Sequence, residues 1–248
     1  MISIIFLCAA GFLAAFVDSI AGGGGLISVP AFLMAGIPPH IALGTNKFSS
    51  STASFTSSFK FATSGKINFN LIKFMAPLTL VGAILGVKTV LLVDQKILYP
   101  LVMILVLSVG VYTFFSKNLG MNNYFERATK TNLTLGMLLA FTIGFYDGFF
   151  GPGAGSFLIF GFIKIFKFDF VNAAGNGKIL NFVSNITSFV VFAIEGKVWF
   201  LQGIFVAVFM ILGAHFGTKA ALTKGSKLIR PIFIVMSFGV LIKLVITL

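Results

Sequence analysis

The chain has 248 residues, of which 58% are hydrophobic and 10% are charged, and its mean hydropathy is +1.05. Soluble domains usually carry about 25% charged residues, so the composition excludes an ordinary water-soluble protein. The formal net charge is +12, but the basic residues lie mostly in short links between apolar runs, where we expect them to contact anionic lipid headgroups. No basic domain stands outside these runs, so we expect the lipid bilayer as a partner and no nucleic acid.

The first half of the chain predicts helices of unequal length. A long apolar helix ends at an acidic residue and a glycine-rich break, and a short apolar piece follows. That piece is too brief to cross a hydrocarbon core, which needs about 20 residues. A Ser-rich helix and two ordinary spans complete the series. In chain order, the segments are Ile2 to about Ser19, Gly22 to Gly25, Leu26 to Ala35, about Ala42 to Thr63, about Phe69 to Leu92, and Ile97 to Phe115.

The second half has the same order of segments after a polar linker at residues 116–130. Its segments are Thr131 to about Tyr146, a break at Gly151 to Gly155, Ser156 to Phe166, about Ala173 to Ile194, Val198 to Leu222, and Leu228 to Val245. None of these segments has the alternating pattern of a strand, so the predicted fold is all-α.

An internal duplication explains this shared order. When the chain is shifted by 131 residues, Ala42 to Val109 aligns with Ala173 to Val240, and 20 of 68 positions are identical. Chance would give roughly 4 to 6 identities. Upstream the offset is 129, which pairs Asp18 with Asp147. The predicted units are repeat 1 at residues 1–115, the polar linker at 116–130 and repeat 2 at 131–248.

The number of membrane crossings depends on the two short pieces. If each piece is re-entrant or half-length, each unit crosses four times, the copies are parallel and the total is eight. If each piece crosses fully, each unit crosses five times and the copies are inverted. Both kinds of repeat occur in transporters. We favour a polytopic transmembrane helix bundle of about eight spans, in two homologous four-helix repeats with short broken or re-entrant helices.

Each copy carries a row of polar residues at helical spacing inside an apolar segment. The rows are Lys47, Ser50, Ser54 and Ser57 in the first copy and Lys178, Asn181, Asn185 and Ser188 in the second. Steps of three and four residues place each row on one helix face. Polar groups in hydrocarbon are unfavourable unless they are paired, so these faces point to another helix or to a wet cavity. One interpretation is interhelical hydrogen bonding, and the other is a substrate site.

The two lysines favour the substrate site. An ammonium near the start of a helix meets the positive end of the helix dipole, and a bound anion would relieve this repulsion. Lys47 and Lys178 therefore suggest an anion site between the copies. The alternative is that each lysine extends from a helix end to the headgroups.

The glycine breaks point to the same region. Glycine adopts positive φ and lets backbone N–H groups approach a ligand, although a tight turn at the bilayer surface would also use glycine. Asp18 and Asp147 precede the two breaks. They either cap the short helices or exchange a proton during transport.

These segments resemble a known family. Gly11 to Gly25, followed by Val29-Pro30, Gly36 and Ala42 to Lys47, is similar to the first signature of the sulfite exporter TauE/SafE family of membrane transporters. Gly148 to Gly155, with Ala174 to Lys178, is similar to the second signature. The resemblance implies a multi-pass permease of the cell inner (plasma) membrane for a small sulfur-containing anion, such as sulfite or an organosulfonate. The site residues it implies are Gly22, Gly24, Thr45, Asn46, Gly151, Gly153 and Asn176.

An intramembrane hydrolase and an anion channel are the alternatives to a carrier. A zinc protease needs a His-Glu-x-x-His motif, and neither His40 nor His215 is followed by Glu. A serine hydrolase could use Ser156 with His215, but Ile84 stands at the position equivalent to His215 in the other copy. We therefore expect no enzyme, no cofactor and no metal, and a homo-oligomer stays open.

Overall fold

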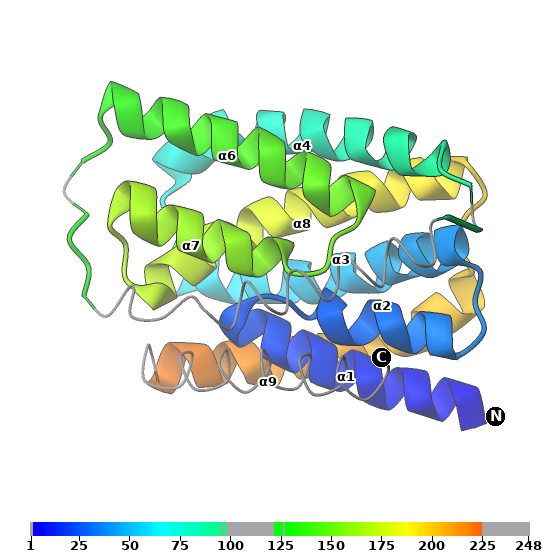
Figure 1. Cartoon of the computed structure of the whole chain (residues 1–248). Coiled ribbons are helices and arrows are strands. Elements are labelled where there is room, and N and C mark those ends of the chain that lie inside the picture. The colour runs from blue at the N-terminus through cyan, green and yellow to red at the C-terminus, as the bar shows by residue number, and fades with distance from the viewer. Residues whose placement is uncertain (1, 95, 98–121, 126, 225–248) are drawn as a thin grey trace, which may run out of the picture.

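The computed structural model describes residues 2–94, 96–97, 122–125 and 127–224, and the regular elements in these ranges are eight α-helices (Figure 1). In chain order they are α1 (Ile2–Ala21), α2 (Gly25–Met34), α3 (Pro39–Thr63), α4 (Phe69–Leu91), α6 (Lys130–Phe149), α7 (Ala154–Phe166), α8 (Phe170–Ile194) and α9 (Phe200–Lys224). The predicted all-α class is confirmed for the described part of the chain.

Four of the described helices are long and apolar enough to cross a membrane. The crossing segments are Ile4–Ala21, Phe69–Leu91, Phe170–Ile194 and Phe200–Lys224. Helices α2 and α7 are apolar but have only 10 and 13 residues. Large apolar side chains such as Phe205, Val208 and Leu212 are exposed on the outside of α9, as expected for a surface that faces lipid.

Ring contacts fix the relative direction of the two polar helices, α3 and α8. Phe48 of α3 lies 4.9 Å from Phe189 of α8, and Phe55 lies 5.4 Å from Phe182, measured between ring centroids. The residue number rises along one helix as it falls along the other. Helices α3 and α8 are therefore antiparallel, although the sequence aligns them as copies of each other.

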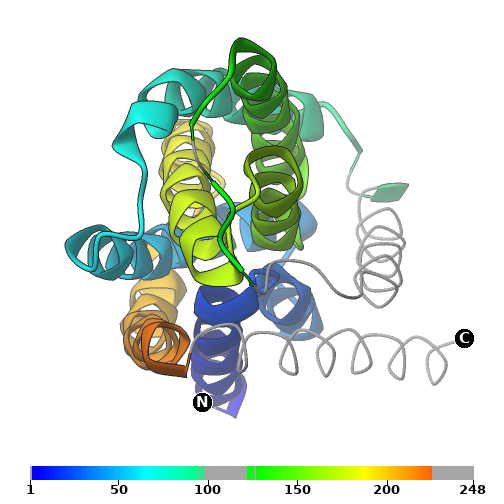
Figure 2. The same cartoon turned by 90° about the vertical axis from the view of Figure 1, so that its left-hand side faces the viewer.

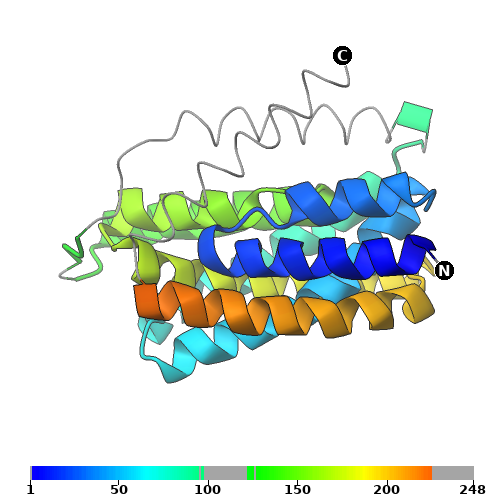
Figure 3. The same cartoon turned by 90° about the horizontal axis from the view of Figure 1, so that it is seen from below.

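Glycine contacts fix the direction of the outer helices. A β-carbon on Gly82 or Gly86 of α4 would lie 2.4 Å from the Phe141 carbonyl oxygen and 2.1 Å from the Phe145 carbonyl oxygen of α6, respectively. The equivalent glycines of α9 contact α1 in the same way, since Gly213 faces Phe12. Small residues thus let each parallel helix pair approach closely. Each pair combines one helix from each copy, and Figure 3 shows α1 and α9 side by side.

The described helices of the second copy therefore run opposite to those of the first. Helix α2 turns back toward the end of the bundle where α1 begins, and α7 turns back toward the end where α6 begins (Figure 1). Each short helix therefore runs opposite to the long helix before it. The parallel arrangement had no such reversal. The expectation of parallel copies was wrong for the described residues.

The inverted arrangement removes the parallel copies to which eight spans were linked, and the number of spans stays a prediction. The expected spans Ile97 to Phe115 and Leu228 to Val245 lie almost entirely outside the described residues, and so does the first part of the linker, residues 116–121. Within the described part, the bundle has α4 and α6 on one side and α1 and α9 on the other (Figure 2). Two buried apolar clusters, each with residues from both copies, pack around the centre.

Candidate functional site

The two glycine breaks meet at the centre of the bundle. A β-carbon on Gly22 would lie 2.3 Å from the backbone nitrogen of Ser156, and one on Gly25 would lie 2.9 Å from the Cα of Pro152. The Ser156 hydroxyl donates to the Ala21 carbonyl at 3.0 Å, which joins the start of α7 to the end of α1. The breaks are thus in contact with each other and are not separate turns at the bundle surface.

The two lysines of the polar rows form ion pairs across the copies. Lys47 Nζ donates to Asp147 Oδ1 at 2.7 Å, and Lys178 Nζ donates to Asp18 Oδ2 at 2.5 Å. Each pair thus joins a lysine of one copy to the aspartate of the other. All four side chains are buried except Asp18, which is 22% exposed, compared with 4% for Asp147.

These contacts correct two parts of the sequence reasoning. Lys47 is the ninth residue of α3 and Lys178 the ninth of α8, so both lie beyond the first turn, where the dipole acts. Neither lysine reaches the headgroups, because their side chains are only 3% and 1% exposed and end on carboxylates. The positive charges are therefore matched by two negative charges, and the four groups together are neutral.

The two aspartates differ in their remaining contacts. Asp18 Oδ1 accepts the Gly24 N–H at 3.0 Å, just before the first turn of α2, so this residue caps the short helix. Asp147 Oδ2 accepts from the Asn181 side-chain amide at 3.3 Å. The capping interpretation thus describes Asp18, which also binds Lys178, whereas Asp147 contacts the side chains of both polar helices.

A cavity lies between the breaks and the polar helices, with a volume of about 30 Å³ for water-sized spheres. One water needs about 10–15 Å³ on this scale, so the cavity holds about two waters. Its lining residues are Ala14, Ala15, Asp18, Gly23, Gly24, Gly25, Ser28, Asn46, Lys47, Ser50, Ala53, Asp147, Gly151, Gly153, Gly155, Asn181, Asn185 and Met210.

The structure gathers most of the predicted site residues around this cavity. The sequence reasoning named Asp18, Gly24, Asn46, Lys47, Ser50, Asp147, Gly151, Gly153, Asn181 and Asn185, and all of them line it. It did not name Ser28, whose hydroxyl donates to the Gly24 carbonyl at 3.3 Å. The position of Ser28 one turn after the first break was the signal that could have identified it.

Five predicted residues do not line the cavity, namely Gly22, Thr45, Ser54, Asn176 and Lys178. Gly22 contacts Ser156, and Lys178 lies behind Asp18. Thr45 Oγ1 accepts the Trp199 N–H and Asn176 Oδ1 accepts the Asn68 N–H, each at 2.9 Å. Thr45 and Asn176 are equivalent, and each fixes the link between the last two described helices of the opposite copy.

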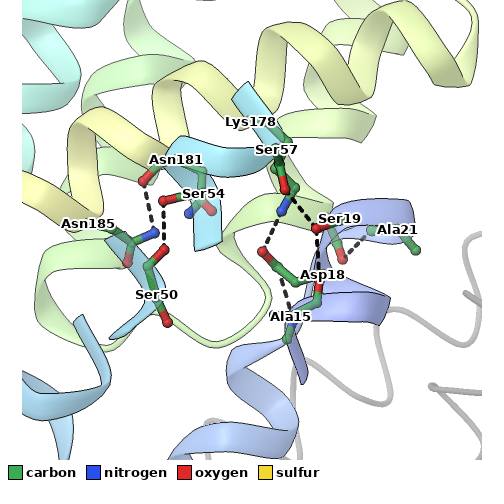
Figure 4. Close-up of polar contacts among 12 residues, drawn as sticks. Ala15, Asp18, Ser19, Ala21, Ser50, Ser54, Ser57, Lys178, Asn181 and Asn185 are labelled. Atoms are coloured by element: carbon green, nitrogen blue, oxygen red, sulfur yellow. Dashed lines mark hydrogen bonds and ion pairs between the residues drawn. The ribbon is translucent and has the colours of Figure 1, made fainter. Parts of the chain in front are cut away.

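The polar rows serve partly as interhelical or local contacts (Figure 4). The Ser54 hydroxyl donates to the Ser50 carbonyl at 2.7 Å, and the Asn185 amide donates to the Asn181 carbonyl at 2.9 Å. Ser57 lies 2.7 Å from the Ser19 hydroxyl of α1. Ser54, although predicted as a site residue, satisfies its hydroxyl within its own helix and does not line the cavity.

The buried oxygen of the Asn46 side-chain amide has no hydrogen-bond partner among the described residues, and the hydroxyls of Ser58, Ser184, Ser188 and Thr218 share this property but do not line the cavity. Asn46 lines the cavity and is 6% exposed. Buried polar groups in native structures are nearly always paired, so an unpaired one next to a cavity is consistent with a water or a solute as its partner.

The hydrolase alternative gains no support. The Ser156 hydroxyl donates to the Ala21 carbonyl, whereas His215 is on the exposed side of α9. The described residues also contain no group of three or more His, Cys, Asp or Glu side chains that could hold a metal ion.

Inverted helices that meet at broken segments, with buried charges beside a central polar cavity, are typical of a membrane transporter. Comparison with known proteins agrees with this class. The family model described as "Sulfite exporter TauE/SafE" matches residues 7–244. The chain belongs to the TauE/SafE family, as its two signatures predicted.

Curated relatives have the same class in their names. A "Probable membrane transporter protein" of Haemophilus influenzae is 38% identical over 95% of this chain and 91% of its own length. The "Probable membrane transporter protein ORF9" of a Sinorhizobium species is 38% identical over 96% of this chain and 91% of its own length. The "Probable membrane transporter protein YfcA" of Escherichia coli K12 is 35% identical over 96% and 87%, respectively. No solved structure was found to match the chain.

Proposed function

We propose that this protein is a secondary transporter that carries a small anion through the central cavity, with sulfite, an organosulfonate or a related sulfur-containing anion as the substrate. The observation that carries the proposal is that the Lys47 ammonium lies at a cavity beside which two short helices begin. The family description names sulfite export, which supports an oxyanion of sulfur as the first substrate to test.

The short helices favour an anion because of their direction. Helices α2 and α7 start at Gly25 and Ala154, beside the cavity, so the positive ends of both helix dipoles lie next to it. Two positive helix ends and the Lys47 ammonium therefore lie at the same small space, together with the carboxylates of Asp18 and Asp147. Broken helices bind anionic substrate groups in this way in other transporters.

Alternating access fits this site better than an open pore. The aspartate of one ion pair is partly exposed and the aspartate of the other is sealed, although the two pairs are equivalent in sequence. A carrier needs two states that open to opposite sides, and inverted copies supply them when they exchange conformations. An anion channel has no need for this difference between the pairs.

The charges at the two ends of the bundle support an orientation in the cell inner membrane. Nine basic residues lie near the end where α3, α7 and α9 finish, namely Lys60, Lys66, Lys73, Arg127, Lys130, Lys164, Lys167, Lys219 and Lys224. Three lie near the other end, namely Lys88, Lys96 and Lys197. Basic residues concentrate in cytoplasmic loops, so we place the first end in the cytoplasm.

Counterflow in liposomes tests the proposed function. Vesicles with purified protein are loaded with unlabelled sulfite, methanesulfonate or acetate, and uptake of the same radiolabelled anion is measured. We expect counterflow of at least one sulfur oxyanion, reduced strongly in Lys47→Met and unchanged in Lys73→Met, whose lysine is exposed on α4. Absence of counterflow for all three anions in the wild type would contradict the proposal.

A further inference from the structure

We propose that the transported anion moves together with one proton, and that Asp147 holds this proton while the anion occupies Lys47. The inference rests on the proposed anion transport and adds the coupling ion. It follows from three features of the ion pair: its place in the cavity, its access and the contacts left to the carboxylate.

The place of the ion pair makes an incoming anion compete with Asp147. Lys47 and Asp147 both line the cavity, and the Lys47 ammonium donates to Asp147 Oδ1. Lys178 is absent from the lining, so Lys47 provides the ammonium of the cavity within the described residues. An oxyanion that binds Lys47 from the cavity therefore takes the place of Asp147 Oδ1.

Gly151 gives the cavity access to this pair. A β-carbon at Gly151 would lie 3.1 Å from Lys47 Nζ and 3.2 Å from Asp147 Oδ1, and its φ of +102° is one that L residues rarely adopt. Both charged atoms thus face the position where any other residue would carry a side chain. The glycine leaves the ion pair open to a small solute.

The contacts that remain to Asp147 explain why its carboxylate takes up a proton. Once Lys47 binds the anion, the carboxylate keeps one hydrogen bond, from Asn181 at 3.3 Å. A buried carboxylate without a cation is strongly unfavourable, so it takes up a proton. A new O–H bond forms on Asp147, and the proton comes from the bulk solution, relayed through the water of the cavity, so that no hydroxide is left in the site.

Charge balance supports one proton for each singly charged anion. In the resting site, the ammonium and the carboxylate sum to zero. In the loaded site, the ammonium, the anion and the neutral carboxylic acid also sum to zero. The low-dielectric centre of the protein therefore never holds a net charge from this pair.

The neighbouring charged groups are paired elsewhere or lie on the outside of the bundle, so the exchange involves Lys47 and Asp147. Asp18 of α1 also lines the cavity, but it stays bound to Lys178 of α8 and to the Gly24 N–H. The charged residues of the two other helices packed against α6 are exposed on the outside of the bundle: Lys73 and Lys88 of α4 and Lys164 of α7. The Tyr146 hydroxyl, next in sequence, donates to the Pro152 carbonyl.

The test uses the full chain in liposomes with the membrane potential clamped at zero and radiolabelled methanesulfonate or sulfite, whichever shows counterflow. A tenfold proton gradient should drive about tenfold accumulation of a singly charged anion by the wild type. Asp147→Asn should lose the accumulation, whatever rate of counterflow it retains. Glu195→Gln, which changes an exposed carboxylate in a loop, should keep both.

A second measurement does not depend on the folding of a variant. Addition of the anion to the purified wild type in weak buffer should cause uptake of about one proton for each anion bound. Counterflow without a response to the proton gradient, or binding without proton uptake, would overturn the coupling and leave the proposed function intact. Loss of the proton drive in Asp18→Asn, with the drive kept in Asp147→Asn, would overturn the choice of Asp147. A wild type without counterflow would remove the proposed function itself.

Discussion

Gly151 and Lys47 are so close that a β-carbon on Gly151 would lie 3.1 Å from the lysine ammonium nitrogen. The glycine comes from the second copy and the lysine from the first, so the access to the ion pair is built jointly by both. This relationship explains why a residue without a side chain is needed at the second break, beyond the need for a turn.

Replacement of Gly151 by alanine should close this access. We expect flux to fall by about 10–100-fold, because even a small misplacement at a binding site has effects of this size. The matched control is Gly196→Ala, since Gly196 also has a positive φ, +64°, but a β-carbon there meets nothing within 4 Å. An equal loss of flux in both variants would mean that backbone strain, and not the closed access, causes the effect.

The ion pair between Lys47 and Asp147 should dominate the stability of the centre. Lys47→Met leaves a buried carboxylate without its cation, and such a loss costs about 3–5 kcal/mol. The double variant Lys47→Met/Asp147→Asn removes both charges and should recover most of that loss. Thermal unfolding in detergent measures the effect, and an equal loss in the single and double variants would contradict the pairing.

Lys178 and Asp18 allow the same comparison in the other copy. Asp18→Asn should be milder than Asp147→Asn, because the Asp18 side chain is 22% exposed and water already screens part of the attraction between its carboxylate and Lys178. A more severe loss of stability in Asp18→Asn would show that the sealed pair is not the stronger one.

The inverted arrangement predicts opposite membrane sides for two equivalent loops. Ser64 lies in the loop between α3 and α4, and Glu195 lies in the loop between α8 and α9, and both are exposed. In a background with Cys8→Ser, an impermeant thiol reagent should label Glu195→Cys from outside the cell and Ser64→Cys only from the cytoplasm. Labelling of both from the same side would contradict the inversion.

The contacts of the outer helices depend on glycine. Gly86→Val should separate α4 from α6 and Gly217→Val should separate α9 from α1, because a β-carbon at these positions would lie 2.1 and 2.2 Å from the Phe145 and Phe16 carbonyl oxygens. We expect strong loss of folded protein in size-exclusion profiles for both. Leu85→Ile, at an exposed position of α4, should leave the profile unchanged.

The duplication, the breaks and the polar rows are patterns that can be read along the chain. The cavity lining follows from these patterns, since Asn46, Ser50 and Asn181 lie on helix faces that had to be covered. The direction of the second copy could not be read in this way. It depends on whether α2 returns to the side on which α1 begins, and the local sequence of a short apolar helix is the same in either case.

The pairing of each lysine with the aspartate of the other copy could not be predicted from the sequence, for the same reason. Buried Lys47 needs an opposite charge, and two aspartates stand in apolar surroundings, but the sequence-based interpretation assigned the lysines to a bound anion and did not pair them. Whether Lys47 meets Asp18 or Asp147 depends on the relative direction of the copies. The signatures also named Thr45 and Asn176 without revealing their role, which is a hydrogen bond to a backbone amide of the opposite copy.

The exchange of partners between α1 and α9, and between α4 and α6, has a consequence for how the protein is made. The glycine-lined face of α4 stays uncovered until α6 enters the membrane, and α1 waits for α9, nearly two hundred residues later in the chain. Neither half can mature alone in the bilayer, and during synthesis the first half must be shielded by lipid or by the insertion machinery. Two separately expressed halves should therefore assemble only when the cell produces both together.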